Sequence, residues 1–341
     1  MKTLRLFVLI LLCAVGLIFL PARIHSASSP SPLVLTGAIP LRGVTGRIDH
    51  FAFDPKNRLF VSALGNDSEE VIDLSAQKVV HSITGIPSPQ GVAYSPETNK
   101  LFVASAKGKL FIYDGTSFAP IGTIDFRSDV DNLRYEASTK RVYVGYGDGE
   151  DAGISVIDAT TNRRLREGYR LGAHPESFQL ESAGPNIFVN VPELQQIAVI
   201  NRDTRAVLRW PVTPKANFPM ALDEADHRLF VATRNPPLTL VYDSASGKLV
   251  AAPTCVQDSD DLYYDAIRKR IYVTGGEGFI TVLQQEDPNQ YRLLARIPSA
   301  LGARTAGYSG PIGKKGLDRL YVAVPARGNQ GAEVRIYTVQ D

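Results

Sequence analysis

A four-residue pattern recurs seven times along the chain, and this repetition constrains the fold more than any other feature. Each copy consists of an apolar residue, an aromatic residue, valine and a small residue, with Asn in the last position of one copy. The aromatic residues stand at positions 60, 102, 143, 188, 230, 272 and 321, which are 41 to 49 residues apart. This spacing suits a four-stranded propeller blade. The sequence therefore predicts an all-β, seven-bladed β-propeller.

The residues around each copy repeat as well. A short strand that ends in a turn precedes the pattern, as in residues 51–55, and a loop rich in Gly or Asp follows it. A third β-rich run comes next, and in most copies it ends in an acid or amide: Asp73, Asp114, Asp158, Asn201 and Asp243. Short polar side chains of this kind close tight turns by accepting backbone N–H groups. We therefore interpret these five residues as structural.

The two ends of the repeat region complement each other. The seventh copy has no fourth strand, because its third β-rich run ends at Val339, close to the last residue. A spare β segment, Leu33 to Leu41, precedes the first copy. If this segment pairs with the last blade, the ring closes and both exposed sheet edges disappear. We expect one propeller domain over residues 33–341, with its last blade completed by the N-terminal strand.

The repeats resemble those of a known family. The triplet Tyr272-Val273-Thr274, its Phe-Val-Ser and Phe-Val-Ala variants and the Val-Ile-Asp-like run that follows are similar to the YVTN-repeat, YncE-like propellers. The resemblance covers essentially the whole region after the N-terminal segment. It implies the propeller fold and a periplasmic or cell-surface location, but no defined activity. Related propellers include lactonases and the haem domains of nitrite reductases; the chain has no Cys-x-x-Cys-His, which excludes covalent haem attachment.

Charge and cysteine content exclude several functions. The 37 Lys and Arg residues nearly balance 35 Asp and Glu residues. Non-specific binding to nucleic acid or anionic lipid needs clustered basic residues, so neither is an expected partner. Cys255 is the single cysteine after the N-terminal segment, so an internal disulfide or a zinc cluster cannot form there. We interpret Cys255 as a packing residue.

The N-terminal segment has the pattern of an export signal. Lys2 and Arg5 precede an apolar run over residues 6–20, which is shorter than the ~20 residues that a spanning helix usually needs. We expect residues 1–28 to be a signal peptide. The alternative is an uncleaved anchor in the inner membrane through residues 6–20. Both interpretations place the propeller outside the cytoplasm, either periplasmic or secreted.

Alignment of the seven first strands predicts which side chains surround the mouth of the central channel. The first ring consists of Asp49, Gln90, Asp131, Glu176, Phe218, Asp260 and Arg304. The adjoining ring consists of His50, Gly91, Asn132, Ser177, Pro219, Asp261 and Thr305. Four acids in a ring of seven exceed what chance placement suggests, and converging carboxylates raise one another's pKa unless a cation compensates. We expect the polar members of these rings to form the ligand-binding site.

Two kinds of compensation fit the acid ring. Asp49, Asp131, Glu176 and Asp260 could hold one divalent cation, because oxygen ligands suit Ca²⁺, Mg²⁺ or Mn²⁺. Alternatively, Arg304 and ordered water satisfy a solvated channel lining that holds no metal. His50 could serve as a metal ligand or as a general base oriented by a carboxylate. Since adjacent strand residues point to opposite sides, Asp49 and His50 need not face the same space.

Two functions follow from this pattern. The first is a monomeric binding or scaffold protein that recognises a protein, peptide, glycan or small molecule through its polar channel-mouth face. The alternative is a metal-dependent hydrolase of the lactonase type, in which the acid ring binds the ion that activates water. Polar loops between second and third strands, such as residues 65–67 and 275–278, would add specificity in either case. Residues 147–151 lack the spaced acids of a calcium-binding EF-hand loop, so we interpret them as a surface turn.

Overall fold

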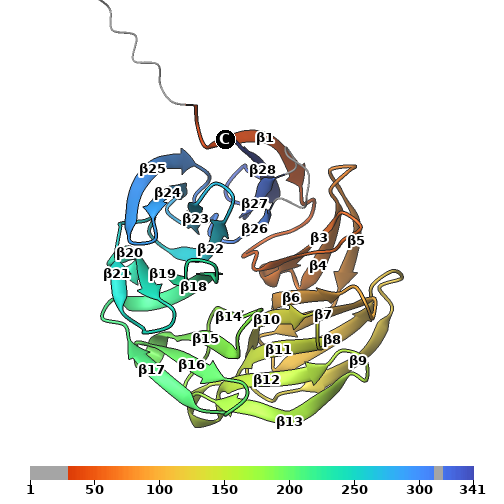
Figure 1. Cartoon of the computed structure of the whole chain (residues 1–341). Helices are drawn as coiled ribbons and strands as arrows, with labels where there is room; N and C mark the ends of the chain where they lie inside the picture. The colour runs from red at the N-terminus through yellow and green to blue at the C-terminus, as the bar shows by residue number, and fades with distance from the viewer. Residues whose placement is uncertain (1–29, 311–317) are drawn as a thin grey trace, which may run out of the picture. The chain divides into compact units, whose positions relative to one another are not determined.

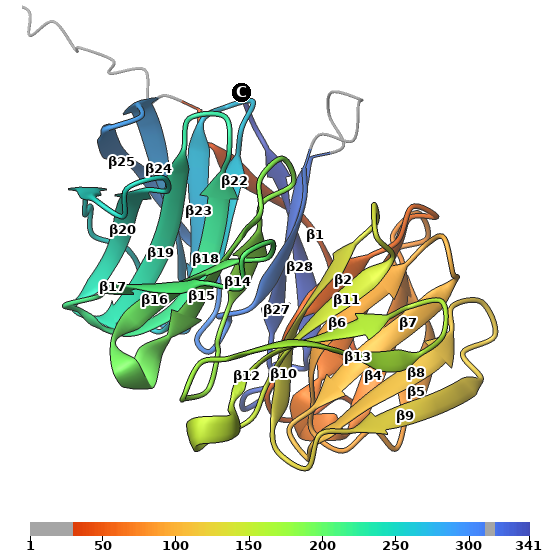
Figure 2. The same cartoon turned by 60° about the horizontal axis from the view of Figure 1, so that its bottom comes forward.

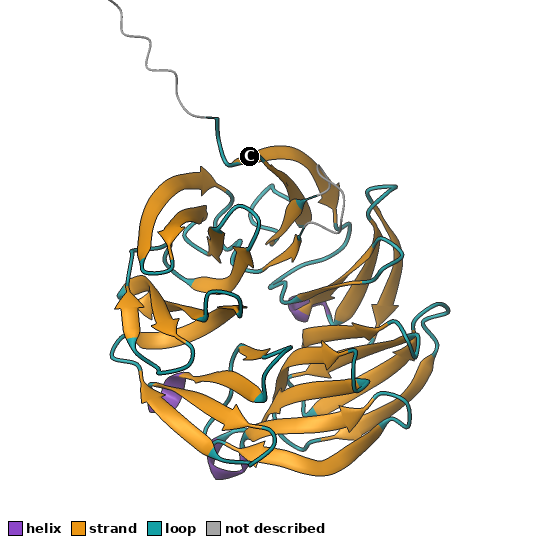
Figure 3. Cartoon of the chain, viewed as in Figure 1, coloured by secondary structure: helices purple, strands orange, loops and turns teal. Residues whose placement is uncertain are grey.

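Antiparallel sheets make up almost all of the regular structure in the computed structural model, which describes residues 30–310 and 318–341. These residues form 28 strands in seven four-stranded sheets (Figure 1). Each sheet is one blade, and the seven blades are arranged as a β-propeller. The described helices are three single 3₁₀ turns, η1 (Leu64–Asn66), η2 (Gly149–Asp151) and η3 (Pro192–Leu194) (Figure 3). The predicted fold class is confirmed.

Each blade follows the order predicted from the repeats. Blade 1 contains β2 (Phe51–Phe53), β3 (Arg58–Ala63), β4 (Ser68–Asp73) and β5 (Lys78–Thr84). Blade 2 contains β6 (Pro89–Ser95), β7 (Lys100–Ser105), β8 (Lys109–Asp114) and β9 (Pro120–Asp125). Blade 3 contains β10 (Val130–Glu136), β11 (Arg141–Tyr146), β12 (Gly153–Asp158) and β13 (Arg163–Arg170). Blade 4 contains β14 (Phe178–Leu180), β15 (Asn186–Val191), β16 (Gln196–Asn201) and β17 (Val207–Pro211).

The remaining blades have the same strand order within the sheet. Blade 5 contains β18 (Lys215–Asp223), β19 (Arg228–Asn235), β20 (Pro237–Asp243) and β21 (Leu249–Ala251). Blade 6 contains β22 (Ser259–Asp265), β23 (Arg270–Gly275), β24 (Phe279–Asp287) and β25 (Gln290–Pro298). Blade 7 contains β26 (Ala306–Ser309), β27 (Arg319–Val324), β28 (Glu333–Val339) and β1 (Leu33–Pro40).

The N-terminal strand closes the ring, as predicted. β1 pairs with β28 in antiparallel register, with Leu33 opposite Val339 and Ile39 opposite Val334. The first strands of neighbouring blades pack against one another around the central axis, and β26 of blade 7 contacts β2 of blade 1 (Figures 1 and 2). The first strands therefore line the channel, and the sheets of the first and last blades are complete.

The aromatic residues of the repeated pattern pack the blades together. All seven are buried, from Phe60 with none of its surface exposed to Tyr321 with 7%. Phe60 of blade 1 packs among Val92, Leu101 and Val103 of blade 2. An aromatic side chain at this position fills the space between adjacent sheets, and its burial stabilises the propeller. The pattern therefore reports on blade packing and carries no information about the ligand.

The residues that end the third strands close turns, as predicted. Asp73 Oδ1 accepts hydrogen bonds from the backbone N–H groups of Ser75 and Ala76. Side-chain oxygens at the four equivalent positions accept backbone N–H groups in the same way: Asp114, Asp158, Asn201 and Asp243. These polar residues therefore have a structural role outside the channel.

The expected signal peptide or anchor, residues 1–28, lies outside the described residues. Within the described part of the chain, no helix has the length and apolar character needed to cross a membrane. The described strands belong to one unit, Ser31–Asp341. Cys255 is free and half-buried beside the core between blades 5 and 6.

Candidate functional site

Bulges at one end of the first strands shape the channel mouth. In blade 3, Val130 of β10 pairs with Tyr146 of β11 and Leu133 pairs with Val144, so β10 has one more residue than β11 between these two pairs. Equivalent register shifts occur in β6, β18 and β22. In blade 1, Asp49 N–H donates to Ser62 O and Ser62 N–H donates to His50 O, so one residue of β3 faces two residues before β2. A bulge interrupts the alternation of side chains and redirects them.

The bulges bring members of both predicted rings to the same channel. Asp49 and His50 do face each other, with 3.7 Å between Asp49 Oδ1 and His50 Nε2. Strand alternation left this open, and it does not separate the two residues because both precede β2 and lie in the bulge. Gly91 is required in blade 2, since a Cβ atom there would stand 2.1 Å from the backbone oxygen of Asp131.

The channel contains two adjoining chambers, one for each ring. The mouth chamber has a volume of about 360 Å³, and its walls include all members of the first ring except Asp49. The inner chamber has a volume of about 520 Å³ and is lined by five members of the second ring: His50, Gly91, Asn132, Ser177 and Asp261. Asp49 is buried between the two and lines neither. The predicted site residues are therefore divided between two spaces.

Three arginines neutralise one side of the mouth chamber. Arg47 Nη2 lies 3.2 Å from Asp49 Oδ2 and 3.6 Å from Asp260 Oδ2. Arg234 Nη2 donates to Asp260 Oδ1 at 2.7 Å, and its guanidinium lies over the ring of Phe218. Arg304 Nη2 lies 2.8 Å from Asp258 Oδ2. These guanidinium groups form ion pairs with the acids contributed by blades 1 and 6.

The opposite side, formed by blades 3 and 4, has an excess of acids. Its chamber wall contains Asp129, Asp131, Asp148, Glu176 and Glu193, with His174 as the one basic residue among the described lining residues on that side. Gln90 Nε2 donates to Asp129 Oδ1 at 2.8 Å, which supplies a neutral donor to one of these acids. The mouth is therefore asymmetric, with acids paired with arginines on one side and more carboxylates than cations on the other.

Asp131, His174 and Glu176 form the closest group on the acidic side. One ligand atom from each lies within 4.8 Å of the others. His174 Nε2 stands 3.8 Å from Asp131 Oδ2, and the other ring nitrogen, Nδ1, makes a 2.8 Å hydrogen bond with Gly147 O. With Nδ1–H donating to this carbonyl, Nε2 is directed toward the two carboxylates. The loop that we interpreted as a surface turn thus orients a side chain of the site.

The pKa values in this group follow from burial and from its mixed charges. Burial and the Asp131 carboxylate raise the pKa of Glu176 to about 8. Burial opposes the charge of His174, but Asp131 and Glu176 outweigh it and raise its pKa to about 10. Burial also acts on Asp131, where His174, His50 and Arg47 reverse the effect and lower the pKa. At neutral pH the group holds a charged Asp131, a charged His174 and a largely protonated Glu176.

His50 connects the two chambers. Its Nε2 lies 3.9 Å from Asp131 Oδ1, and its Nδ1 lies 3.5 Å from Asp261 Oδ1. Burial alone would lower the pKa of His50, but Asp49 and Asp261 raise it to about 10. A protonated imidazole cannot accept a proton. His50 therefore fits the role of a fixed cation better than that of a general base at neutral pH.

The two aligned rings do not include several residues of the mouth. Positions two residues before the first ring hold Arg47, Ser88, Asp129, His174, Ala216, Asp258 and Gly302. Four of these seven are charged or titratable, and all four contact ring residues or line the mouth chamber. Extending the same alignment by two residues would have identified them. Arg234 gives no such signal, because it lies at the end of β19, outside the aligned first strands.

Comparisons with known proteins establish the fold. No family model and no curated protein matches the sequence. The WD40 repeats of RRP9 superpose with a TM-score of 0.75 at 14% identity, covering 91% of this chain and 98% of that chain. The chain has a WD40-like propeller fold. Hydrazine synthase of Kuenenia stuttgartiensis gives a TM-score of 0.71 at 17% identity over 85% of this chain and 96% of that chain.

A chain of the mitotic checkpoint complex is also similar, with a TM-score of 0.72 at 14% identity over 99% of this chain and 100% of that chain. At these identities the likeness extends to architecture alone. Unrelated functions share the same propeller, so the function of this chain has to be argued from its channel.

Proposed function

We propose that this chain is a binding protein whose channel mouth receives a basic side chain of a protein or peptide partner. The observation that carries the proposal is the excess of carboxylates on the side of the mouth formed by blades 3 and 4. Asp131 Oδ1 is buried there and has no hydrogen-bond partner among the described residues. A lysine ammonium or an arginine guanidinium would donate hydrogen bonds to this oxygen and add positive charge to a wall on which carboxylates outnumber cations.

The surrounding structure supports a ligand that enters from the mouth. The three arginines of the opposite wall are each ion-paired with acids of blades 1 and 6, and the acids of blades 3 and 4 outnumber the cation beside them, His174. Propellers are common interaction scaffolds, and one structural neighbour belongs to a checkpoint complex. The same proposal has three further parts. The chain is one of the YVTN-repeat, YncE-like propellers, it is monomeric, and it is located outside the cytoplasm.

Binding of a lysine-rich peptide tests this function. We expect a labelled Gly–Ser peptide with several lysines to bind, and the matching glutamate peptide not to bind, in fluorescence anisotropy at low salt. Asp131→Asn should weaken binding about tenfold, because one buried charge is lost. Glu286→Gln removes the same charge from an exposed pair with Arg292 and should leave affinity unchanged. Equal binding of the two peptides would refute the proposal.

The affinity for the lysine peptide should rise with pH. Glu176 has a raised pKa of about 8, so it is mostly protonated at pH 7 and ionised at pH 9. The groups facing it are Asp131 and Asp260, which are acids, and His174 and His50, whose pKa values of about 10 keep them charged over most of this window. We expect several-fold tighter binding at pH 9, and Glu176→Gln should abolish the increase. A pH-independent affinity in the unaltered protein would contradict this role of Glu176.

A second candidate is metal-dependent hydrolysis of a lactone or ester, which the Asp131–His174–Glu176 group favours. Two carboxylates and an imidazole whose other nitrogen is hydrogen-bonded to a backbone oxygen match a common arrangement of metal ligands. The nitrogen ligand suits Mn²⁺ or Zn²⁺ better than Ca²⁺. Asp49 and Asp260, also expected as ligands, face Arg47 instead, so the group that we favour contains Asp131 and Glu176 but not these two. A bound ion would supply an activated water.

Calorimetric titration of the chelator-treated protein tests this candidate. We expect one Mn²⁺ or Zn²⁺ ion to bind with release of protons, since Glu176 and His174 hold protons at neutral pH. His174→Gln should reduce affinity at least about tenfold, and lactone hydrolysis should require the ion. If the protein bound neither Mn²⁺ nor Zn²⁺, or if His174→Gln bound the ion as tightly as the unaltered protein, the metal site would be refuted. Recognition of a basic side chain would then be the remaining candidate.

A further inference from the structure

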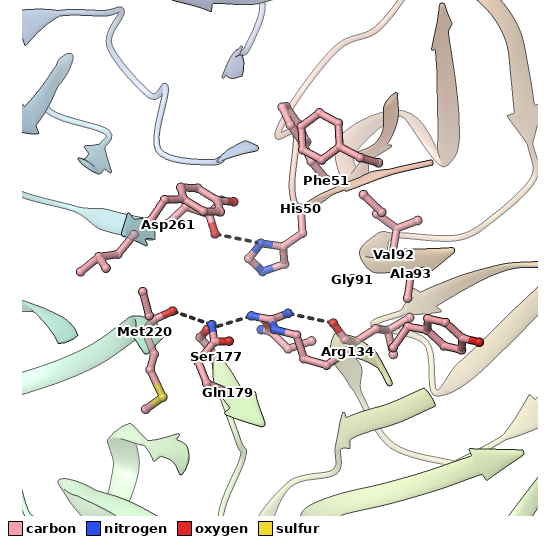
Figure 4. A pocket seen from close by; sticks show the side chains of 18 of the residues that line it. His50, Phe51, Gly91, Val92, Ala93, Arg134, Ser177, Gln179, Met220 and Asp261 are labelled. Atoms are coloured by element: carbon pink, nitrogen blue, oxygen red, sulfur yellow. Dashed lines mark hydrogen bonds and ion pairs between the residues drawn. The ribbon is translucent and has the colours of Figure 1, made fainter. Parts of the chain in front are cut away.

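The inner chamber contains one arginine in an unusual position. Positions three residues after the first ring hold Ala52, Ala93, Arg134, Gln179, Ala221, Tyr263 and Gly307. Four of the seven are Ala or Gly, whereas Arg134, Gln179 and Tyr263 have large polar side chains and line the chamber. Figure 4 shows the guanidinium of Arg134 and the imidazole of His50 pointing into the same cavity.

Arg134 has only neutral hydrogen-bond partners. Nη1 donates to the backbone oxygen of Leu133 at 2.8 Å, and Nη2 donates to Ser177 Oγ at 3.1 Å. No carboxylate of the described chain forms an ion pair with it. Arg228 and Arg268, which are also largely buried, each pair with an aspartate. A guanidinium has five donors, so Arg134 retains donors that can face a ligand in the chamber.

The other charged groups around the chamber leave Arg134 as the lining cation without an ion pair among the described residues. His50 is a second cation that lines the chamber, but Asp49, Asp131 and Asp261 lie within 3.9 Å of its ring nitrogens. The acid that lines this chamber, Asp261, already accepts a hydrogen bond from Ala306 N–H through Oδ2 and faces His50 through Oδ1. Burial lowers the pKa of Arg134, although Tyr263, Asp261 and Asp131 act in the opposite direction. An anionic ligand beside Arg134 would supply the ion-pair partner that it lacks.

The walls indicate what kind of anion fits. Side chains of Phe51, Val92, Leu133, Met220 and Leu262 supply apolar surface around the polar groups. A volume of about 520 Å³ lies in the range of small-molecule sites. A planar guanidinium matches a carboxylate through two parallel hydrogen bonds.

We propose that the inner chamber binds a small organic carboxylate, whose charged end pairs with Arg134 and whose apolar body lies against the channel wall. Gln179 is a neighbouring residue, but its Nε2 already donates to Met220 O at 2.8 Å. The site is separate from the acidic side of the mouth and does not depend on the function proposed there. A carboxylate bound here and a cation bound at the mouth would occupy different chambers.

Titration with benzoate, benzamide and inorganic phosphate tests the proposal on the full chain. We expect benzoate to bind in calorimetry and to raise the melting temperature, whereas neutral benzamide of nearly the same shape does neither. Binding of phosphate but not benzoate would overturn the assignment to an organic carboxylate. Equal binding of benzoate and benzamide would show that charge is not recognised, and would also overturn it.

Substitution of Arg134 locates the site. Arg134→Gln should weaken benzoate binding at least about tenfold, the change expected from losing a charge-assisted pair. Arg134→Lys keeps the charge but lacks the planar guanidinium, so its affinity for benzoate should lie between those of the unaltered protein and Arg134→Gln. It also provides the test if the Gln variant does not fold. Arg292→Gln, on the exposed strand β25, is the matched control and should bind benzoate normally. Unchanged binding by both Arg134 variants would overturn the proposal.

Discussion

Ile39→Asp should destabilise the propeller by at least about 4 kcal/mol. Ile39 lies in β1, has none of its surface exposed and packs with Val334, Ile336 and Leu59 in the core between the last and first blades. A carboxylate at this position would be buried without a partner, or β1 would have to leave β28. Either response destabilises the junction at which the first and last blades meet, and loss of β1 would also open the ring.

A neighbouring position on the same strand provides the control. Leu35 is 51% exposed and lies opposite Tyr337, so Leu35→Asp places the same charge on β1 but in solvent. Its cost should stay within about 0.5 kcal/mol. Urea unfolding followed by circular dichroism measures both variants. Similar midpoints for the two variants would contradict closure of the ring by β1.

The fold could be predicted because each blade repeats the same packing problem. The seven aromatic residues of the repeated pattern, from Phe60 to Tyr321, each fill the space between two adjacent sheets. Their spacing therefore stays regular even where other positions of the repeat vary. The closure could be predicted as well, because the last copy lacks a fourth strand and a spare β segment precedes the first copy. No other pairing removes both exposed edges.

The candidate site could be predicted only in part, because side-chain direction depends on backbone geometry that repeats do not report. The ring alignment placed Asp131 and Asp260 at the mouth, but strand alternation left open whether Asp49 and His50 face the same space. The bulges that bring them together leave no mark in the residue pattern. Pairing of Asp260 with Arg234 was not predictable either, since Arg234 reaches the mouth from the second strand of blade 5.

A second large effect is expected at the junction of blades 6 and 7. Arg268 lies in the turn between β22 and β23, with 12% of its side chain exposed. Its Nη1 stands 3.0 Å from Asp265 Oδ2 and 2.8 Å from Asp318 Oδ2, and its Nε reaches Asp341 Oδ1 at 3.0 Å. Asp265 and Asp318 are almost fully buried, so one guanidinium compensates two buried carboxylates from adjacent blades.

Arg268→Ala should therefore cost about 3–5 kcal/mol, because it leaves buried charges without a counterion. Arg292→Ala breaks an ion pair with Glu286 that is about half exposed on both sides, and should cost no more than about 1 kcal/mol. Urea unfolding measures both. Adding Asp318→Asn to Arg268→Ala removes one stranded charge and should recover part of the lost stability, although Asp318→Asn alone destabilises the protein. If the double variant were as unstable as the sum of the two single variants, the loss would come from packing of the arginine side chain and not from its charge.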